Sequence, residues 1–244
     1  IRRTRNEIKT FYKDDIKNRG LFFPELNKPH EIIYKLDEKL DEIFHSTLLG
    51  IKELSYARYQ PVKYLKEDKF QDYAIGAFEL NQQVNLGGFM KTMLVKRLES
   101  SFYAFKKTVS RIIASYDNFI EMYDSGKVLV SKKHNVYDLY HLDDLDEVLK
   151  GFGADEIKNY KSEDFKEDFI EVLNNDLKIL RDIEANWNDV NLDPKLDALK
   201  NIIEKDLLSQ KIIVFTESKE TATYLFEHLN SIYQNKVMVY SSDV

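Results

Sequence analysis

Cationic and aromatic side chains share one face of a long predicted helix. Apolar side chains recur every three to five residues from Phe89 to Tyr123, which predicts one helix over residues 88–124. A helix of this length spans roughly 55 Å at 1.5 Å per residue. The face opposite the apolar stripe carries Lys96, Tyr103, Lys107 and Arg111. Such a face can follow a nucleic-acid backbone, although a solvated face is the ordinary alternative on an amphipathic helix.

A second set of candidates lies where predicted strands end near the carboxyl end of the sequence. Residues 211–215 and 236–240 are near-continuously apolar, which is typical of parallel strands covered by helices on both faces. An amphipathic helix is predicted between them, over residues 218–229. The polar residues that follow the two strands are Thr216, Lys219, Ser241 and Ser242. Strand ends and helix N-terminal amides suit phosphate oxygens, whereas N-cap and turn chemistry at the serines is the alternative.

The first residues form a basic arm. Residues 1–19 carry seven Lys and Arg side chains against three acidic ones, although the whole chain has a net charge of -6. We predict a short basic helix that ends at Gly20. Arg2, Arg3 and Arg5 could bridge two domains or contact phosphate, and a solvated arm is the alternative.

Several kinds of site are excluded or disfavoured by the sequence. In "GGFMKTM", Met90 stands where a phosphate loop needs glycine directly before Lys91. The five histidines lack metal-ligand spacing, so we expect no metal site, and we identify no catalytic residue. The chain contains no cysteine, which excludes disulfides and fits a reducing cytoplasm, our expected location. No apolar run approaches the length that spans a bilayer, so we expect no membrane partner.

The remaining patterns define the elements that would position these residues. Few glycines and prolines favour long helices over an all-β fold. A strand is predicted over residues 31–36, followed by a helix from Asp37. Further on we predict a short strand at residues 127–130 and a short helix at 141–151. A long helix should follow with Ser162 as its N-cap, and another should start with Asp193 as N-cap and Pro194 at its first position.

Three segments resemble one protein family. The stretch "DPKLDALKNIIEK", followed by "KIIVFTESKETATYLFEHL", resembles the entry into the second RecA-like domain of superfamily 2 helicases. The opening "IRRTRNEI" is similar to the end of the first motor domain in the SWI/SNF-like branch. The stretch "MLVKRLESSFYAFKKTV" resembles a long helix of RapA-related bacterial helicases. Together these segments cover about a third of the chain.

The resemblance implies an α/β, mainly helical fold, in which a long-helix insertion precedes the start of a RecA-like parallel sheet. Residues 1–27 would be the connection from motor domain 1, and residues 28–45 the first strand and helix start of motor domain 2. Residues 46–190 would be the helical insertion, and residues 191–244 the partial domain 2 with the motif IV region. In this family the neighbourhood of Thr216 and Lys219 touches the nucleic-acid backbone.

The function implied is that of a fragment of an ATP-dependent nucleic-acid helicase or translocase. The Walker A, Walker B and motif VI residues of the family have no counterpart in the sequence, so we expect no ATP hydrolysis by this segment alone. ATP and Mg²⁺ would be cofactors of the parent protein. We expect nucleic acid, with DNA favoured over RNA, as its partner, and a possible homodimer through the truncated sheet.

Two other readings remain open at this point. The first is a non-catalytic helical module that interacts with protein or nucleic acid. The second is a small phosphate-binding α/β enzyme, which the missing glycine loop disfavours.

Overall fold

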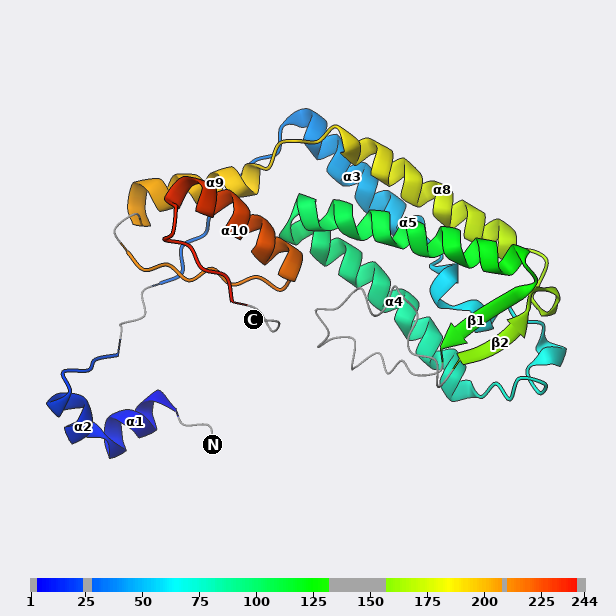
Figure 1. Ribbon diagram of the computed structural model, residues 1–244, viewed down its shortest axis with the longest axis horizontal. Coiled ribbons are helices and arrows are strands. Elements are labelled where there is room, and N and C mark those ends of the chain that lie inside the picture. The colour runs from blue at the N-terminus through cyan, green and yellow to red at the C-terminus, as the bar shows by residue number, and fades with distance from the viewer. Residues whose placement is uncertain (1–3, 24–27, 132–156, 208–209, 241–244) are drawn as a thin grey trace. The chain divides into compact units, whose positions relative to one another are not determined.

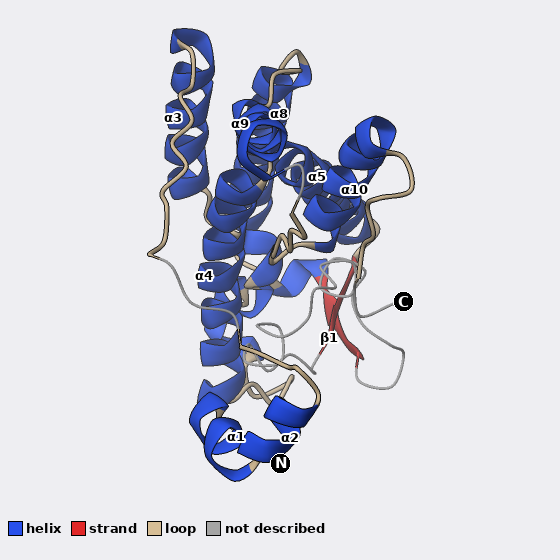
Figure 2. Ribbon diagram, turned by 90° about the vertical axis from the view of Figure 1, so that its left-hand side faces the viewer, coloured by secondary structure: helices blue, strands red, loops and turns tan. Residues whose placement is uncertain are grey.

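The computed structural model describes residues 4–23, 28–131, 157–207 and 210–240. The chain divides into two compact units, Ile1–Ile33 and Tyr34–Val244. The described residues are mainly helical and include one small antiparallel sheet of two strands. Figure 2 shows this composition by colour, with helices in blue and strands in red. The predicted mainly helical character is therefore confirmed.

The first unit contains two short helices, α1 (Arg5–Phe11) and α2 (Lys13–Asn18). Thr4 caps α1 through a reciprocal pair of hydrogen bonds with Glu7, which satisfies helix N–H groups that have no partner within the helix. Gly20 has a φ of 61°, a backbone conformation that favours glycine. The predicted short basic helix ending at Gly20 is confirmed, as two consecutive helices. Neither helix contains a buried residue.

Four helices of the second unit pack as a bundle. These are α3 (Glu38–Glu53), α4 (Ala77–Ser100), α5 (Phe102–Asp124) and α8 (Phe169–Asn188). Contacts join α3 to α4, α4 to α5, α5 to α8 and α8 to α3, so each helix has two neighbours in the ring. Figure 1 shows these helices running side by side. Asp37 caps α3 by accepting a hydrogen bond from the Leu40 N–H at 2.8 Å, which confirms the helix predicted from Asp37.

The single helix predicted over residues 88–124 is wrong, because the chain breaks at Ser101. This residue is extended, with φ -161° and ψ 128°, and its Oγ accepts a hydrogen bond from the Ala104 N–H at 3.3 Å. The helix α4 therefore ends at Ser100, and α5 folds back along it. Serine competes with the helical backbone through its hydroxyl and is favoured at N-caps, which explains a break at this position.

The main hydrophobic core belongs to the bundle. All the buried side chains of this core lie between Leu40 and Trp187. The apolar stripe of α8 supplies many of them, and its buried members on the helix are Phe169, Leu173, Leu177, Leu180, Ile183 and Trp187. The indole N–H of Trp187 donates a hydrogen bond to the Thr47 hydroxyl at 2.7 Å, so the largest buried ring has its polar atom satisfied.

The loop between α3 and α4 contains the short helical turns η1 (Ala57–Tyr59), η2 (Pro61–Tyr64) and η3 (Glu67–Lys69). Here the sequence supported no firm prediction. Ser162, predicted as the cap of the long helix, instead begins the turn η5 (Ser162–Asp164), and α8 starts at Phe169.

The small sheet pairs β1 (Lys127–Ser131) with β2 (Ile157–Lys161) in antiparallel register, with Val128 opposite Tyr160. Both of these side chains are buried. The strand predicted at residues 127–130 is confirmed, whereas the helix predicted at residues 141–151 lies outside the described residues.

Two further helices follow the bundle, α9 (Pro194–Ile202) and α10 (Lys219–Tyr233), with the π-helical turn η6 (Ile203–Leu207) after α9. Their N-caps are Asp193, as predicted, and Ser218, where capping was the alternative to phosphate binding. Residues 31–36, 211–215 and 236–240 are all described and carry no strand, so the predicted parallel sheet is not formed by these residues. A strand is stable only when neighbouring strands satisfy its N–H and C=O groups, and these apolar segments remain largely exposed.

Candidate functional site

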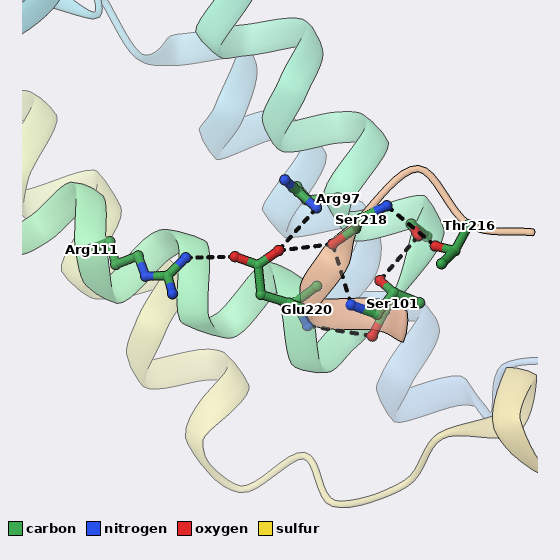
Figure 3. Close-up of polar contacts among 9 residues, drawn as sticks. Arg97, Ser101, Arg111, Thr216, Ser218 and Glu220 are labelled. Atoms are coloured by element: carbon green, nitrogen blue, oxygen red, sulfur yellow. Dashed lines mark hydrogen bonds and ion pairs between the residues drawn. The ribbon is translucent and has the colours of Figure 1, made fainter. Parts of the chain in front are cut away.

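The site lies where the first turn of α10 meets the turn between α4 and α5. The helix α10 packs on α5, and the hydroxyls of Ser100 and Thr221 are 3.4 Å apart. Figure 3 shows the polar contacts at this junction. Two sets of predicted candidates, the basic face and the strand-to-helix turn, therefore meet at one place.

Glu220 is the centre of this junction. One of its carboxylate oxygens accepts a hydrogen bond from Arg111 Nη1 at 2.6 Å, and the other lies 3.3 Å from Arg97 Nη1 (Figure 3). The Ser218 hydroxyl donates to the same carboxylate at 2.9 Å. The side chains of Arg97, Glu220 and Arg111 are 10, 15 and 34% exposed, so these charges are partly shielded from water.

The protonation of Glu220 follows from these contacts. Burial by itself raises the pKa of this carboxyl group, because it disfavours the charged form. The hydrogen bonds from Arg111 and Ser218 and the charge of Arg97 act in the opposite direction and hold the pKa below its ordinary value. Glu220 is thus ionised at neutral pH, and a carboxylate between two guanidinium groups gives the strong, directional kind of ion pair.

The turn that precedes α10 is organised around its N-cap. The Ser218 hydroxyl accepts a hydrogen bond from the Thr221 N–H, and the Thr216 hydroxyl accepts one from the Ser218 N–H, both at 3.3 Å. The N-cap role weighed for Ser218 is confirmed. Lys219 is exposed beside this turn, whereas Ser241 and Ser242 lie outside the described residues.

The predicted basic face is the surface on which α10 rests. Tyr103 stacks on Tyr224 of α10, with ring centroids 4.8 Å apart and planes 14° from parallel. The ammonium group of Lys107 lies 4.6 Å from the centroid of the Tyr103 ring, and Lys96 pairs with Glu217 at 3.5 Å. These candidates thus have partners within the chain, and their binding of nucleic acid stays a prediction. Arg5 lies in the first unit, with its guanidinium 5.3 Å from the Phe23 ring, whereas Arg2 and Arg3 lie outside the described residues.

Helix α9 is tied to the same junction. The Tyr224 hydroxyl donates a hydrogen bond to one oxygen of Asp193 at 3.0 Å, and the other oxygen caps α9 by accepting from the Leu196 N–H at 2.9 Å. Lys195 donates to the backbone carbonyl of Glu99 at 2.9 Å, at the C-terminal end of α4, where a cation is favoured. Burial and the neighbouring Asp193 carboxylate raise the pKa of Tyr224.

A second polar centre, Asp176, lies inside the bundle. Its fully buried carboxylate accepts hydrogen bonds from the Ser55 N–H at 2.7 Å, the Ala57 N–H at 2.9 Å and the Tyr116 hydroxyl at 2.9 Å. Burial raises the pKa of Asp176 despite these donors. Its donors come from α5 and from the start of the loop after α3, so it anchors that loop to the bundle.

Sequence reasoning missed Arg97, Glu220 and Asp176. A signal existed for Asp176, because it stands within the apolar stripe of α8, next to Leu177. Glu220 stands in the first turn of a capped helix, where an acidic residue is ordinary, so its pairing with distant arginines left no local signal.

Comparison with known proteins identifies no relative: no protein-family model, no curated protein and no solved structure matches the chain. Among the described residues, no group of three or more His, Asp or Glu side chains is placed to hold a metal ion. No helix in the described part of the chain is both long and apolar enough to cross a bilayer.

Proposed function

We propose that this chain is part of a superfamily 2 ATP-dependent helicase or translocase, contributing the interdomain connection, a helical insertion and the start of the second motor domain. The observation that carries the proposal is that the four-helix bundle begins and ends at one place. The helices α3 and α8 run antiparallel, because Thr47 of α3 bonds to Trp187 of α8 and Gly50 of α3 lies against Ile183 of α8. The start of α3 and the end of α8 therefore lie at the same end of the bundle (Figure 1). Adjacent ends are what allow one domain to be inserted into another.

The segments that flank the bundle support the same assignment. Residues 211–215 and 236–240 are apolar, enclose α10 and expose Ile213, Phe215 and Met238. We expect these segments, and residues 31–36, to be strands of a RecA-like parallel sheet once further strands pair with them, with α10 as the crossover helix. ATP and Mg²⁺ would be bound by motifs that do not occur in this sequence.

The expected partner is nucleic acid, with DNA favoured over RNA. Lys96, Lys107 and Lys219 are exposed around the first turn of α10, where they can reach phosphates without displacing the Glu220 contacts. Arg2, Arg3 and Arg5 are expected to lie between the motor domains. The exposed apolar segments also suit pairing with a second copy of the chain, which light scattering during size exclusion would show as a dimer.

The decisive experiment uses the complete protein from which this sequence comes. A Walker A motif before residue 1 and a Gln-x-x-Gly-Arg-x-x-Arg motif after residue 244 would be expected, together with ATP hydrolysis that DNA stimulates and that loss of the Walker A lysine abolishes. If both motifs and the hydrolysis are missing, the motor assignment is wrong.

A second candidate function is a non-catalytic helical module that binds protein or nucleic acid. It is favoured by one observation, namely that the main core is contained between Leu40 and Trp187. The same experiment distinguishes the two, because only the module reading expects the complete protein to lack motor motifs.

A further inference from the structure

We infer that α9 and α10 are held on the bundle by a releasable contact, and that Glu220 is the residue that fastens it. This inference rests on the contacts of the second unit and does not depend on the proposed function. Leu196 is the buried residue of α9, and Thr221 and Leu229 are those of α10. None of the three belongs to the main core. Contacts within a chain that bury few apolar side chains allow the two sides to move relative to one another.

Glu220 reaches both helices that form the docking surface. Arg97 lies on α4, before the break at Ser101, and Arg111 lies on α5, after it. One carboxylate therefore fixes α10 to both α4 and α5 (Figure 3). Because the three charges are partly buried, replacing the carboxylate should cost more than breaking an exposed ion pair.

The same interface contains an exposed ion pair that serves as a matched control. Lys96 and Glu217 lie 3.5 Å apart, and their side chains are 58 and 80% exposed. Pairs of this kind contribute little, because water screens them and ordering two long side chains costs entropy. Removing the charge at residue 217 should therefore leave α10 in place, whereas removing it at residue 220 should not.

Once the ion pairs of Glu220 are broken, the other contacts between the α9–α10 pair and the bundle are expected to be lost together. The stack of Tyr103 on Tyr224, the Ser100–Thr221 contact and the hydrogen bond from Lys195 to the Glu99 carbonyl join the α9–α10 pair to the bundle. The Tyr224–Asp193 hydrogen bond joins α10 to the cap of α9, so the two helices are expected to leave the bundle together and the loss of the three contacts to be coupled. Release would uncover the turn at Thr216 and the Tyr103 ring, while the bundle keeps its own core.

The absence of cysteine from the sequence makes a direct distance measurement simple. Spin labels on Ala114→Cys of α5 and Glu227→Cys of α10, both exposed positions, report the separation of α10 from the bundle. The parent chain should show one narrow distance by pulsed electron resonance. Glu220→Gln should add a population at longer distance, at least roughly tenfold above that of the parent, and Glu217→Gln should leave the distribution unchanged.

The inference is overturned if Glu220→Gln and Glu220→Lys both keep the single narrow distance of the parent. Circular dichroism of each variant shows whether the bundle is still folded. If the Glu220 variants do not fold, a salt titration of the labelled parent tests the inference instead. The population at longer distance should increase as the salt concentration rises to about 1 M, where charges are screened over about 3 Å. An unchanged distance across that titration would equally overturn it.

Discussion

The hydroxyl of Tyr116 on α5 donates a hydrogen bond to the carboxylate of Asp176 on α8, 2.9 Å away in the interior of the bundle. That carboxylate also accepts the N–H groups of Ser55 and Ala57. One acidic side chain thus joins two helices to the loop after α3.

We expect Asp176→Leu to be among the most damaging substitutions in the bundle. Three donors would lose their acceptor, two of them buried, and each loss at a buried group costs about 1–3 kcal/mol. Tyr116→Phe removes only one donor and should cost about 1 kcal/mol in the free energy of unfolding. Urea unfolding followed by circular dichroism measures both. Equal stability of the leucine variant and the parent would show that Asp176 is not the anchor.

The break between α4 and α5 predicts a difference between two adjacent serines. Ser101→Ala removes the hydroxyl that caps α5 and should lower the free energy of unfolding by about 0.5–2 kcal/mol. Ser100→Ala removes only a 3.4 Å contact with Thr221 and should lower it by less. Thermal unfolding of the two variants provides the comparison. A larger loss at residue 100 would contradict the capping role of Ser101.

Acid should weaken the fold partly through Asp164. The Tyr73 hydroxyl donates to Asp164 at 2.5 Å and Lys69 lies 3.5 Å away, and together they hold the pKa of Asp164 below its ordinary value. A carboxyl group with a lowered folded pKa stabilises the fold above its unfolded pKa, and this contribution disappears as pH falls through the folded value. Between about pH 5 and pH 2, Asp164→Asn should therefore lose less stability than the parent. If the free energy of unfolding falls equally with pH in the parent and in Asp164→Asn, this prediction is wrong.

DNA binding should be weak and sensitive to salt. Three cations on one face, Lys96, Lys107 and Arg111, limit the slope of log K against log salt to about -3. Replacing both Lys96 and Lys107 with glutamate should lower the affinity for DNA nearly as much as replacing all three cations, because Arg111 is already bonded to Glu220. Fluorescence anisotropy with a labelled oligonucleotide at several salt concentrations tests this. If the double variant binds like the parent at low salt, this face does not contact DNA.

Residues 1–244 should show no ATP hydrolysis, with or without DNA. The sequence lacks the residues that position Mg²⁺ and the phosphates during phosphoryl transfer. Phosphate release measured against a buffer blank is the appropriate assay. Turnover that a substitution within this span abolishes would show that the chain contains a catalytic site of its own.

Much of the local structure could be predicted from the sequence. The N-cap Asp193 was predicted, the helix start at Asp37 was predicted, and capping by Ser218 was weighed as an alternative, because a capping hydrogen bond joins residues only three positions apart. The buried face of α8 followed from its 3.6-residue period, since one helix carries the whole pattern.

The tertiary structure decided what depends on partners distant in the chain. Leu98 and Phe102 are four residues apart, which is about one helical turn. The apolar pattern therefore continues through Ser101 and does not reveal that the chain turns back there. The apolar residues 211–215 read as a strand, but a strand requires neighbours, and the described residues supply none. Arg111 and Glu220 are 109 positions apart, and neither periodicity nor capping relates residues at that separation. Only the packing of α10 on α5 brings these two charges together, and it thereby places part of the face predicted to bind nucleic acid against another helix of the same chain.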